Sequence, residues 1–143
     1  MALTWYAARA GITVEQNYGP EGVRRFFMGL GERYHVNQES RDLATIRATL
    51  ADLGLDQAIA DDCTTDRFDA TVRASHQEGM ESVGPDVGTP VIRINGQSIF
   101  GPVVSPAPKG EVAGQLFDGV RAVLACPGFF ELKRSRTVGP LYD

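Results

Sequence analysis

The two cysteines are the side chains with the most redox chemistry to offer, and their spacing argues against a dithiol centre. Cys63 and Cys126 lie far apart and form neither a Cys-x-x-Cys motif nor a metal-ligand spacing. Three aspartates flank Cys63 at positions 61, 62 and 66, and their negative charges disfavour its thiolate. Cys126 follows an expected helix, whose C-terminal dipole has the same effect. We therefore expect two free thiols, partly buried, with no dithiol catalysis and no metal site.

His76 is a second residue that could do chemistry, as a general base or a proton relay. An unperturbed imidazole titrates at about 6.5, near physiological pH. A lone histidine inside an expected helix is also common as a surface residue or as a hydrogen-bonded core residue. Both interpretations of His76 stay open on the sequence alone.

Thr89 and Pro90 form the third candidate, at the start of an expected strand. A proline is accepted as the first residue of a strand, where its missing N–H costs no ladder hydrogen bond. An X-Pro bond also adopts the cis form at small cost, typically in a tight turn. The sequence therefore allows a trans proline that only starts a strand, or a cis proline that shapes a loop.

The elements that position these residues are mainly helical up to residue 83. Apolar residues at helical spacing predict helices at about 2–17, 20–34, 41–53, 56–63 and 67–83. Gly19-Pro20 separates the first two, and Ser40 is the expected N-cap of the third, with Gly54 after its end. His76 thus falls in the last of these helices.

The second half of the chain has a different pattern. Asn95-Gly96 joins the runs Val91–Ile94 and Gln97–Phe100, which predicts a β-hairpin with a type I′ turn. A proline-rich connector, a helix at about 109–125 and an apolar, then basic, tail follow. A lone two-stranded ribbon is marginal in water, so the pattern hints at further strands that would cover its open edge.

From Gly88 onward the motifs resemble a known family. They are Gly88-Thr89-Pro90, Ile94-Asn95-Gly96, Phe100-Gly101-Pro102-Val103, Pro106-Ala107-Pro108-Lys109-Gly110-Glu111 and Pro127-Gly128-Phe129-Phe130-Glu131-Leu132-Lys133-Arg134. Together with Ser75-His76 they resemble the DsbA-like thioredoxin-fold oxidoreductases, in particular the group of the mycothiol-dependent nitroreductase. The resemblance implies an α+β, thioredoxin-like fold of DsbA type. Residues 1–65 would be a helical insertion subdomain, and residues 66–143 the C-terminal half of the thioredoxin-like domain.

The same resemblance implies a segment that this sequence does not contain. Family members begin with a strand, a Cys-Pro-x-Cys motif at a helix N-terminus, that helix and a second strand. We therefore expect a truncated member without its own dithiol chemistry, in which Thr89 and cis-Pro90 contact the substrate. The substrate would be a small molecule or a thiol or disulfide, and mycothiol or a similar low-molecular-weight thiol would be the reductant.

Composition limits the other function classes. The formal net charge is −4 and no long Lys/Arg tract occurs, which argues against a nucleic-acid partner. No signal peptide, membrane-spanning run or Gly-rich dinucleotide motif is visible, so we expect a cytoplasmic protein without a bound cofactor. The alternative function is a catalytically silent binding or oligomerisation module, with a homodimer formed through the exposed sheet edge. A third interpretation is that the chain is unstable alone.

Overall fold

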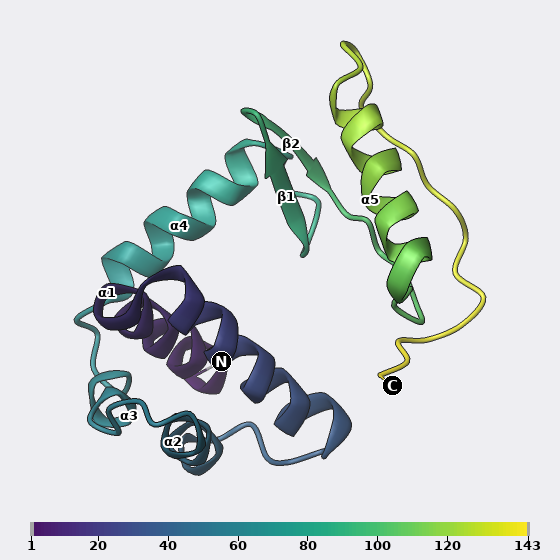
Figure 1. Ribbon diagram of the computed structural model, residues 1–143. Helices are drawn as coiled ribbons and strands as arrows, with labels where there is room; N and C mark the ends of the chain where they lie inside the picture. Colours follow the sequence, from purple (N-terminus) through teal and green to yellow (C-terminus); the bar gives the residue numbers. More distant parts are fainter. Residues whose placement is uncertain (1, 143) are drawn as a thin grey trace. The chain divides into compact units, whose positions relative to one another are not determined.

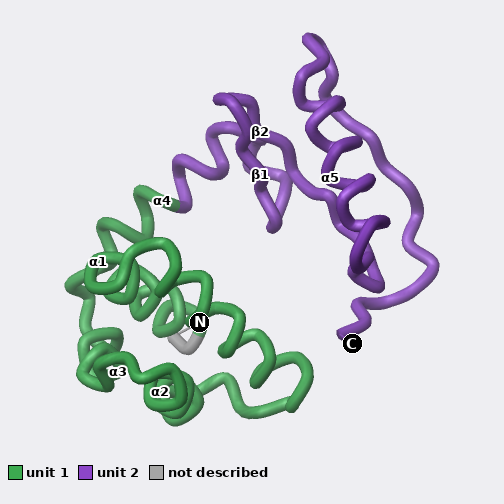
Figure 2. Tube along the Cα trace, viewed as in Figure 1, with its two compact units in different colours: residues 1–75 green, residues 76–143 purple. Residues whose placement is uncertain are grey.

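The computed structural model describes residues 2–142 and contains six helical segments and one β-hairpin (Figure 1). In order along the chain they are α1 (Ala2–Gly31), η1 (Glu32–Val36), α2 (Leu43–Asp52), α3 (Ile59–Asp62), α4 (Asp69–Glu81), β1 (Val91–Ile94), β2 (Gln97–Phe100) and α5 (Gly110–Leu124). The fold is α+β and mostly helical, with a two-stranded antiparallel sheet, and is compatible with a thioredoxin-like architecture. The chain divides into two units, residues 1–75 and 76–143 (Figure 2).

Helix α1 consists of two helices joined by a kink at the predicted separator. Gly19 has φ 67° and ψ −170°, a backbone conformation that is essentially restricted to glycine. Pro20 follows it, and the lack of a proline N–H ends the hydrogen-bonding pattern of the first segment there. The second segment then continues into the π-helical turn η1.

Helix α2 begins at a different cap from the one that the sequence predicted. The N-cap is Asp42, whose Oδ1 accepts a hydrogen bond from Thr45 N at 2.9 Å. Ser40 contributes its backbone carbonyl, which accepts from Thr45 Oγ1 at 2.7 Å. At the other end Gly54 has φ 66°, and Leu55 N donates to Leu50 O at 2.9 Å, so the predicted C-terminal glycine is confirmed.

Unit 1 holds the hydrophobic core of the described chain. Helices α1, α2 and α3 contact one another around ten buried residues. These are Ala10, Val14, Phe26, Leu30, Ile46, Leu50, Leu55, Ile59, Ala60 and Cys63. Arg9 joins the start of α4 to this core, because its guanidinium donates to Asp69 Oδ1 at 2.7 Å and to Cys63 O at 3.2 Å.

Unit 2 contains the hairpin and α5. β1 pairs antiparallel with β2 in the register Val91↔Phe100 to Ile94↔Gln97, and Asn95 and Gly96 both have positive φ, at 51° and 82°. These angles are those of the predicted type I′ turn. Helix α5 contacts β2. Within residues 76–142, however, Gly101 is the one buried residue, so no apolar side chain is buried there. The predicted hairpin and final helix are therefore confirmed. The described part of unit 2 has no hydrophobic core of its own.

Candidate functional site

Thr89 and Pro90 lie in the segment between α4 and β1, and both are exposed. The peptide bond that joins them is cis. Pro90 O accepts a hydrogen bond from Gly101 N at 2.8 Å, which extends the hairpin ladder by one pair beyond Val91↔Phe100. This pairing fixes the orientation of the backbone on either side of Pro90.

The outer edge of β1 begins directly after Thr89 and Pro90. In an antiparallel ladder successive residues direct their N–H and C=O groups alternately toward the partner strand and away from it. Because Pro90 bonds inward to Gly101, Val91 and Arg93 belong to the outward set. Thr89 lies before the strand, in a bend, and the alternation does not assign a direction to its groups. An extended ligand could pair with Val91 and Arg93 next to Thr89.

His76 lies on α4, exposed, and nothing in the structure joins it to Thr89 or Pro90. Its imidazole forms no hydrogen bond or ion pair with any other residue of the described chain. The link between α4 and the hairpin is instead the ion pair of Glu78 Oε1 with Arg93 Nη1, at 2.6 Å. The role of His76 as a proton relay thus stays a prediction.

The cysteines are both free, and they differ in accessibility. Cys63 is 0% exposed, and its Sγ lies 3.2 Å from Ala60 O, to which the thiol donates. Burial raises the pKa of the Cys63 thiol, and the nearby Arg9 guanidinium offsets only part of that effect. Cys126 follows α5 and is exposed. A thiol kept protonated by burial is a poor nucleophile, so Cys63 is a core residue.

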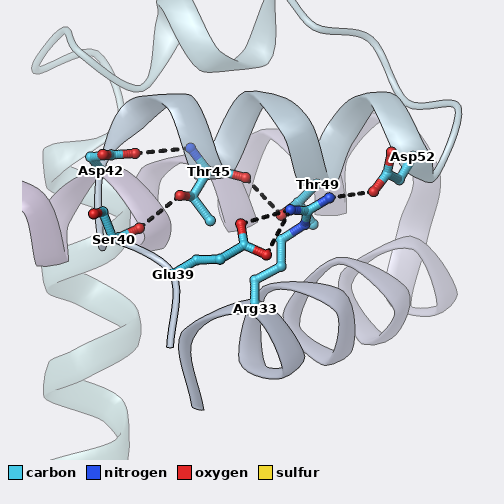
Figure 3. Close-up of polar contacts among 7 residues, drawn as sticks. All are labelled: Arg33, Glu39, Ser40, Asp42, Thr45, Thr49 and Asp52. Atoms are coloured by element: carbon cyan, nitrogen blue, oxygen red, sulfur yellow. Dashed lines mark hydrogen bonds and ion pairs between the residues drawn. The ribbon is translucent and has the colours of Figure 1, made fainter. Parts of the chain in front are cut away.

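A shallow hollow beside the start of α2 was not anticipated from the sequence. It has a volume of about 360 Å³ and is lined by Glu39, Ser40, Asp42, Ala44, Thr45 and Ala48. Both carboxylates are already engaged, because Asp42 caps α2 and Glu39 accepts from Arg33 Nη1 at 2.7 Å (Figure 3). Arg33 also pairs with Asp52 at the far end of α2, and both carboxylates raise its pKa. The hollow is thus part of a structural ion-pair network.

Over residues 2–142 no three side chains of His, Cys, Asp or Glu are grouped so that they could hold a metal ion. No described helix has an apolar stretch long enough to cross a bilayer. The outer edge of β1, directly after Thr89 and Pro90, has unpaired backbone groups that could bind an extended ligand.

Comparison with known proteins gives two matches. The family model of the mycothiol-dependent nitroreductase Rv2466c, described as Rv2466c-like, matches residues 1–134. The uncharacterized protein Rv2286c of Mycobacterium tuberculosis (strain ATCC 25618 / H37Rv) is 31% identical over 115 residues, which are 79% of this chain and 49% of that protein. The chain therefore spans about half the length of the curated relative that it matches.

Proposed function

Because the chain belongs to the Rv2466c-like family of mycothiol-dependent nitroreductases, we propose that it acts on the substrate side of a thiol-dependent reduction. The proposal includes a thioredoxin-like fold of DsbA type, of which residues 66–143 form the C-terminal half. In this chain the substrate contacts come from Thr89 and Pro90, and the two electrons come from thiols that the chain does not itself provide. Mycothiol or a similar low-molecular-weight thiol is the proposed reductant.

The observation that carries this proposal is the open outer edge of β1 directly after Thr89 and Pro90. The N–H and C=O groups of Val91 and Arg93 face outward along this edge. An N–H donor and a C=O acceptor on one residue match the amide groups of an extended peptide-like ligand, as in strand addition to a sheet edge. A thiol or disulfide compound that carries amide groups would satisfy both.

The cysteine positions support the absence of dithiol chemistry. Reduction of a disulfide by a protein dithiol needs one thiolate to attack and a second thiol near it to resolve the mixed disulfide. Both cysteines are free, Cys63 in the core of unit 1 and Cys126 exposed in unit 2. Burial raises the pKa of the Cys63 thiol, and the two cysteines form no Cys-x-x-Cys motif, which supports a chain without dithiol chemistry.

Insulin reduction tests the lack of dithiol activity. With a low-molecular-weight thiol as reductant, the purified chain is expected to give the same turbidity rate as buffer. The double variant Cys63→Ala, Cys126→Ala serves as a matched control and should behave identically. Turnover well above the buffer rate that disappears on alkylation of the thiols would contradict the proposal.

Titration with mycothiol disulfide tests the substrate contact. The backbone amide resonances of Gly88, Thr89 and Val91 are expected to shift in a saturable manner. Thr89→Ala should retain most of the affinity, because the proposed bonds use the backbone, whereas Val91→Pro should lose at least tenfold because it removes an outward N–H. Thr71→Ala, exposed on α4, is the control. Shifts confined to residues away from 88–93 would rule the site out.

The second candidate function is a binding module without catalysis, and the same edge favours it. Within the described residues β1 and β2 pair only with each other, so each strand keeps one open edge. A partner segment could add to this edge as a third strand. Binding of unrelated extended peptides with affinity equal to that of mycothiol disulfide, and equally reduced by Val91→Pro, would favour this function over the first.

A further inference from the structure

The C-terminal tail is held at two points, directly after α5 and near the end of the chain. At the first point, Phe129 N donates a hydrogen bond to Cys126 O at 3.3 Å. At the second, the hydroxyl of Ser105, in the connector between β2 and α5, donates to Gly139 O at 3.0 Å. The tethered segment, residues 130–138, runs between these two points, and Figure 1 shows it in yellow.

The backbone of the tethered segment is exposed and unpaired along its whole length. All of its residues are exposed, and within residues 2–142 none of them forms a backbone hydrogen bond. An endoprotease binds its substrate as an extended strand, through backbone N–H and C=O groups. Helices and paired strands must open locally before a protease can cut them. The tethered segment needs no such opening.

The tethered segment also carries three cationic side chains close together. Lys133, Arg134 and Arg136 are exposed, and none of them forms an ion pair or a hydrogen bond with another residue of the described chain. Trypsin-like proteases take a Lys or Arg side chain into a pocket that carries a carboxylate. The residues that follow these three are Arg134, Ser135 and Thr137, and none of them is the proline that blocks such cleavage. Each of the three peptide bonds can therefore be cut.

The other basic residues are less accessible to a protease. Eight of the remaining eleven Lys and Arg residues lie in helices or in β1. Arg67 lies in a turn and pairs with Asp62 at 3.7 Å. Arg41 lies over the ring of Tyr34 just before α2, and Lys109 is the N-cap of α5. Among the described residues, the tethered segment is thus the stretch that best combines basic side chains with an unpaired, exposed backbone.

We propose that the tethered segment is a processing site for an endoprotease that cleaves after basic residues. One water molecule adds across the peptide bond that follows Lys133, Arg134 or Arg136. Its hydroxyl group goes to the carbonyl carbon and its remaining hydrogen to the nitrogen of the next residue, so the step needs no further reactant. Residues 137–143, or a longer piece, then stay attached only through non-covalent contacts such as the Ser105 bond. This processing is independent of the thiol chemistry proposed above.

Limited digestion of the full folded chain with trypsin, followed by intact mass, tests this proposal. The first product is expected to end at residue 133, 134 or 136 and to form at least tenfold faster than any other product. The triple variant Lys133→Gln, Arg134→Gln, Arg136→Gln should be cut at least tenfold more slowly. Arg67→Gln is the matched control, since the Arg67 side chain is 68% exposed, and it should be cut at the wild-type rate. A first cleavage within residues 2–121 would overturn the proposal.

A second measurement asks whether the site is used in cells. The protein isolated from its native source is expected to include a form that ends at residue 133, 134 or 136, and the triple variant expressed in the same cells should lack that form. Far-ultraviolet circular dichroism of the triple variant should match that of the wild type, because the three side chains are exposed and unpaired. Full-length protein alone, or a shortened form that persists in the triple variant, would contradict the proposed site.

Discussion

Cys63 shows how one buried side chain links reactivity to pH. Its thiol is fully covered and its pKa lies above the ordinary value of 9.0, chiefly because burial disfavours the thiolate. In the unfolded chain the same thiol ionises at the ordinary value. The stability that the protonated Cys63 contributes is therefore complete below pH 9.0 and is lost as the pH rises toward the higher folded-state pKa.

We predict that Cys126 alone reacts with a thiol reagent in the folded protein, and that Cys63 reacts after unfolding. Urea unfolding at increasing alkaline pH should show a steeper loss of stability for the wild type than for Cys63→Ala. The alanine variant controls for Tyr34, whose pKa is also raised by burial and which both proteins retain. Equal labelling of the two thiols in the native state would contradict the assignment of Cys63 to the core.

The variant Asp69→Asn tests the ion pair between Arg9 and Asp69, which anchors α4 to the core of unit 1. The Arg9 and Asp69 side chains are only 13% and 26% exposed, and their closest atoms are 2.6 Å apart. Asp69→Asn leaves a mostly covered guanidinium without its counter-charge, so we expect a loss of about 1–3 kcal/mol in the free energy of unfolding. Asp61→Asn is the control: Asp61 pairs with Arg47 at 2.7 Å, but the two side chains are 72% and 41% exposed.

For Asp61→Asn the expected loss is within about 0.5 kcal/mol, because solvent screens an exposed ion pair. Urea unfolding of both variants, at one pH and one salt concentration, gives the comparison. Similar losses for the two variants would mean that the partial burial of Arg9 contributes nothing to the strength of its bond with Asp69.

Among the elements, α2 shows what decides the start of a helix. Ser40 and Asp42 are both favourable N-cap residues, and they stand two positions apart. The choice depends on the backbone: Asp42 is extended, with φ −130° and ψ 179°, and its carboxylate reaches Thr45 N. Residue type alone predicted the helix correctly and placed its cap two residues early.

The two residues therefore offer a matched pair of variants. Asp42→Ala is expected to lower the free energy of unfolding by about 1 kcal/mol, since it removes the side-chain acceptor of an N-terminal N–H. Ser40→Ala should change it by less than about 0.5 kcal/mol, because Ser40 contributes only its backbone carbonyl. Thermal or urea unfolding measures both, and a larger effect at Ser40 would show the cap assignment to be wrong.

How much of this structure the sequence predicts depends on the range of the contacts. Gly19-Pro20 and Asn95-Gly96 determine the backbone conformation at their own positions. The kink and the hairpin turn therefore occur where the sequence predicts them. Ser105 Oγ bonds to the backbone of Gly139 and Leu141, which follow it by 34 and 36 positions, whereas the local sequence around Ser105 predicts only a rigid connector. Likewise, the Gly-Thr-Pro motif indicates Thr89 as a candidate, but the outward direction of the backbone groups of Val91 and Arg93 depends on the hairpin register.

At the scale of the whole chain, stability is distributed unequally between the two units. Every buried hydrophobic residue of the described chain lies between Ala10 and Phe68, whereas the strands and α5 of unit 2 have apolar side chains that are half buried or exposed. Apolar burial is the main favourable term in folding, so the free energy that opposes local opening is concentrated in unit 1.

Hydrogen exchange followed by mass spectrometry tests this distribution directly. At low protein concentration, peptides from α1 and α2 are expected to exchange orders of magnitude more slowly than peptides from β1, β2 and α5. Backbone hydrogen bonds are formed in the helices of unit 1 and in the hairpin and α5 of unit 2 alike. A difference in exchange rate between the two units therefore reflects the hydrophobic core. Leu50→Ala, which removes a fully buried side chain, should accelerate exchange in α1 and leave residues 91–124 unchanged. Equal protection of the two units would mean that unit 2 acquires a core in solution.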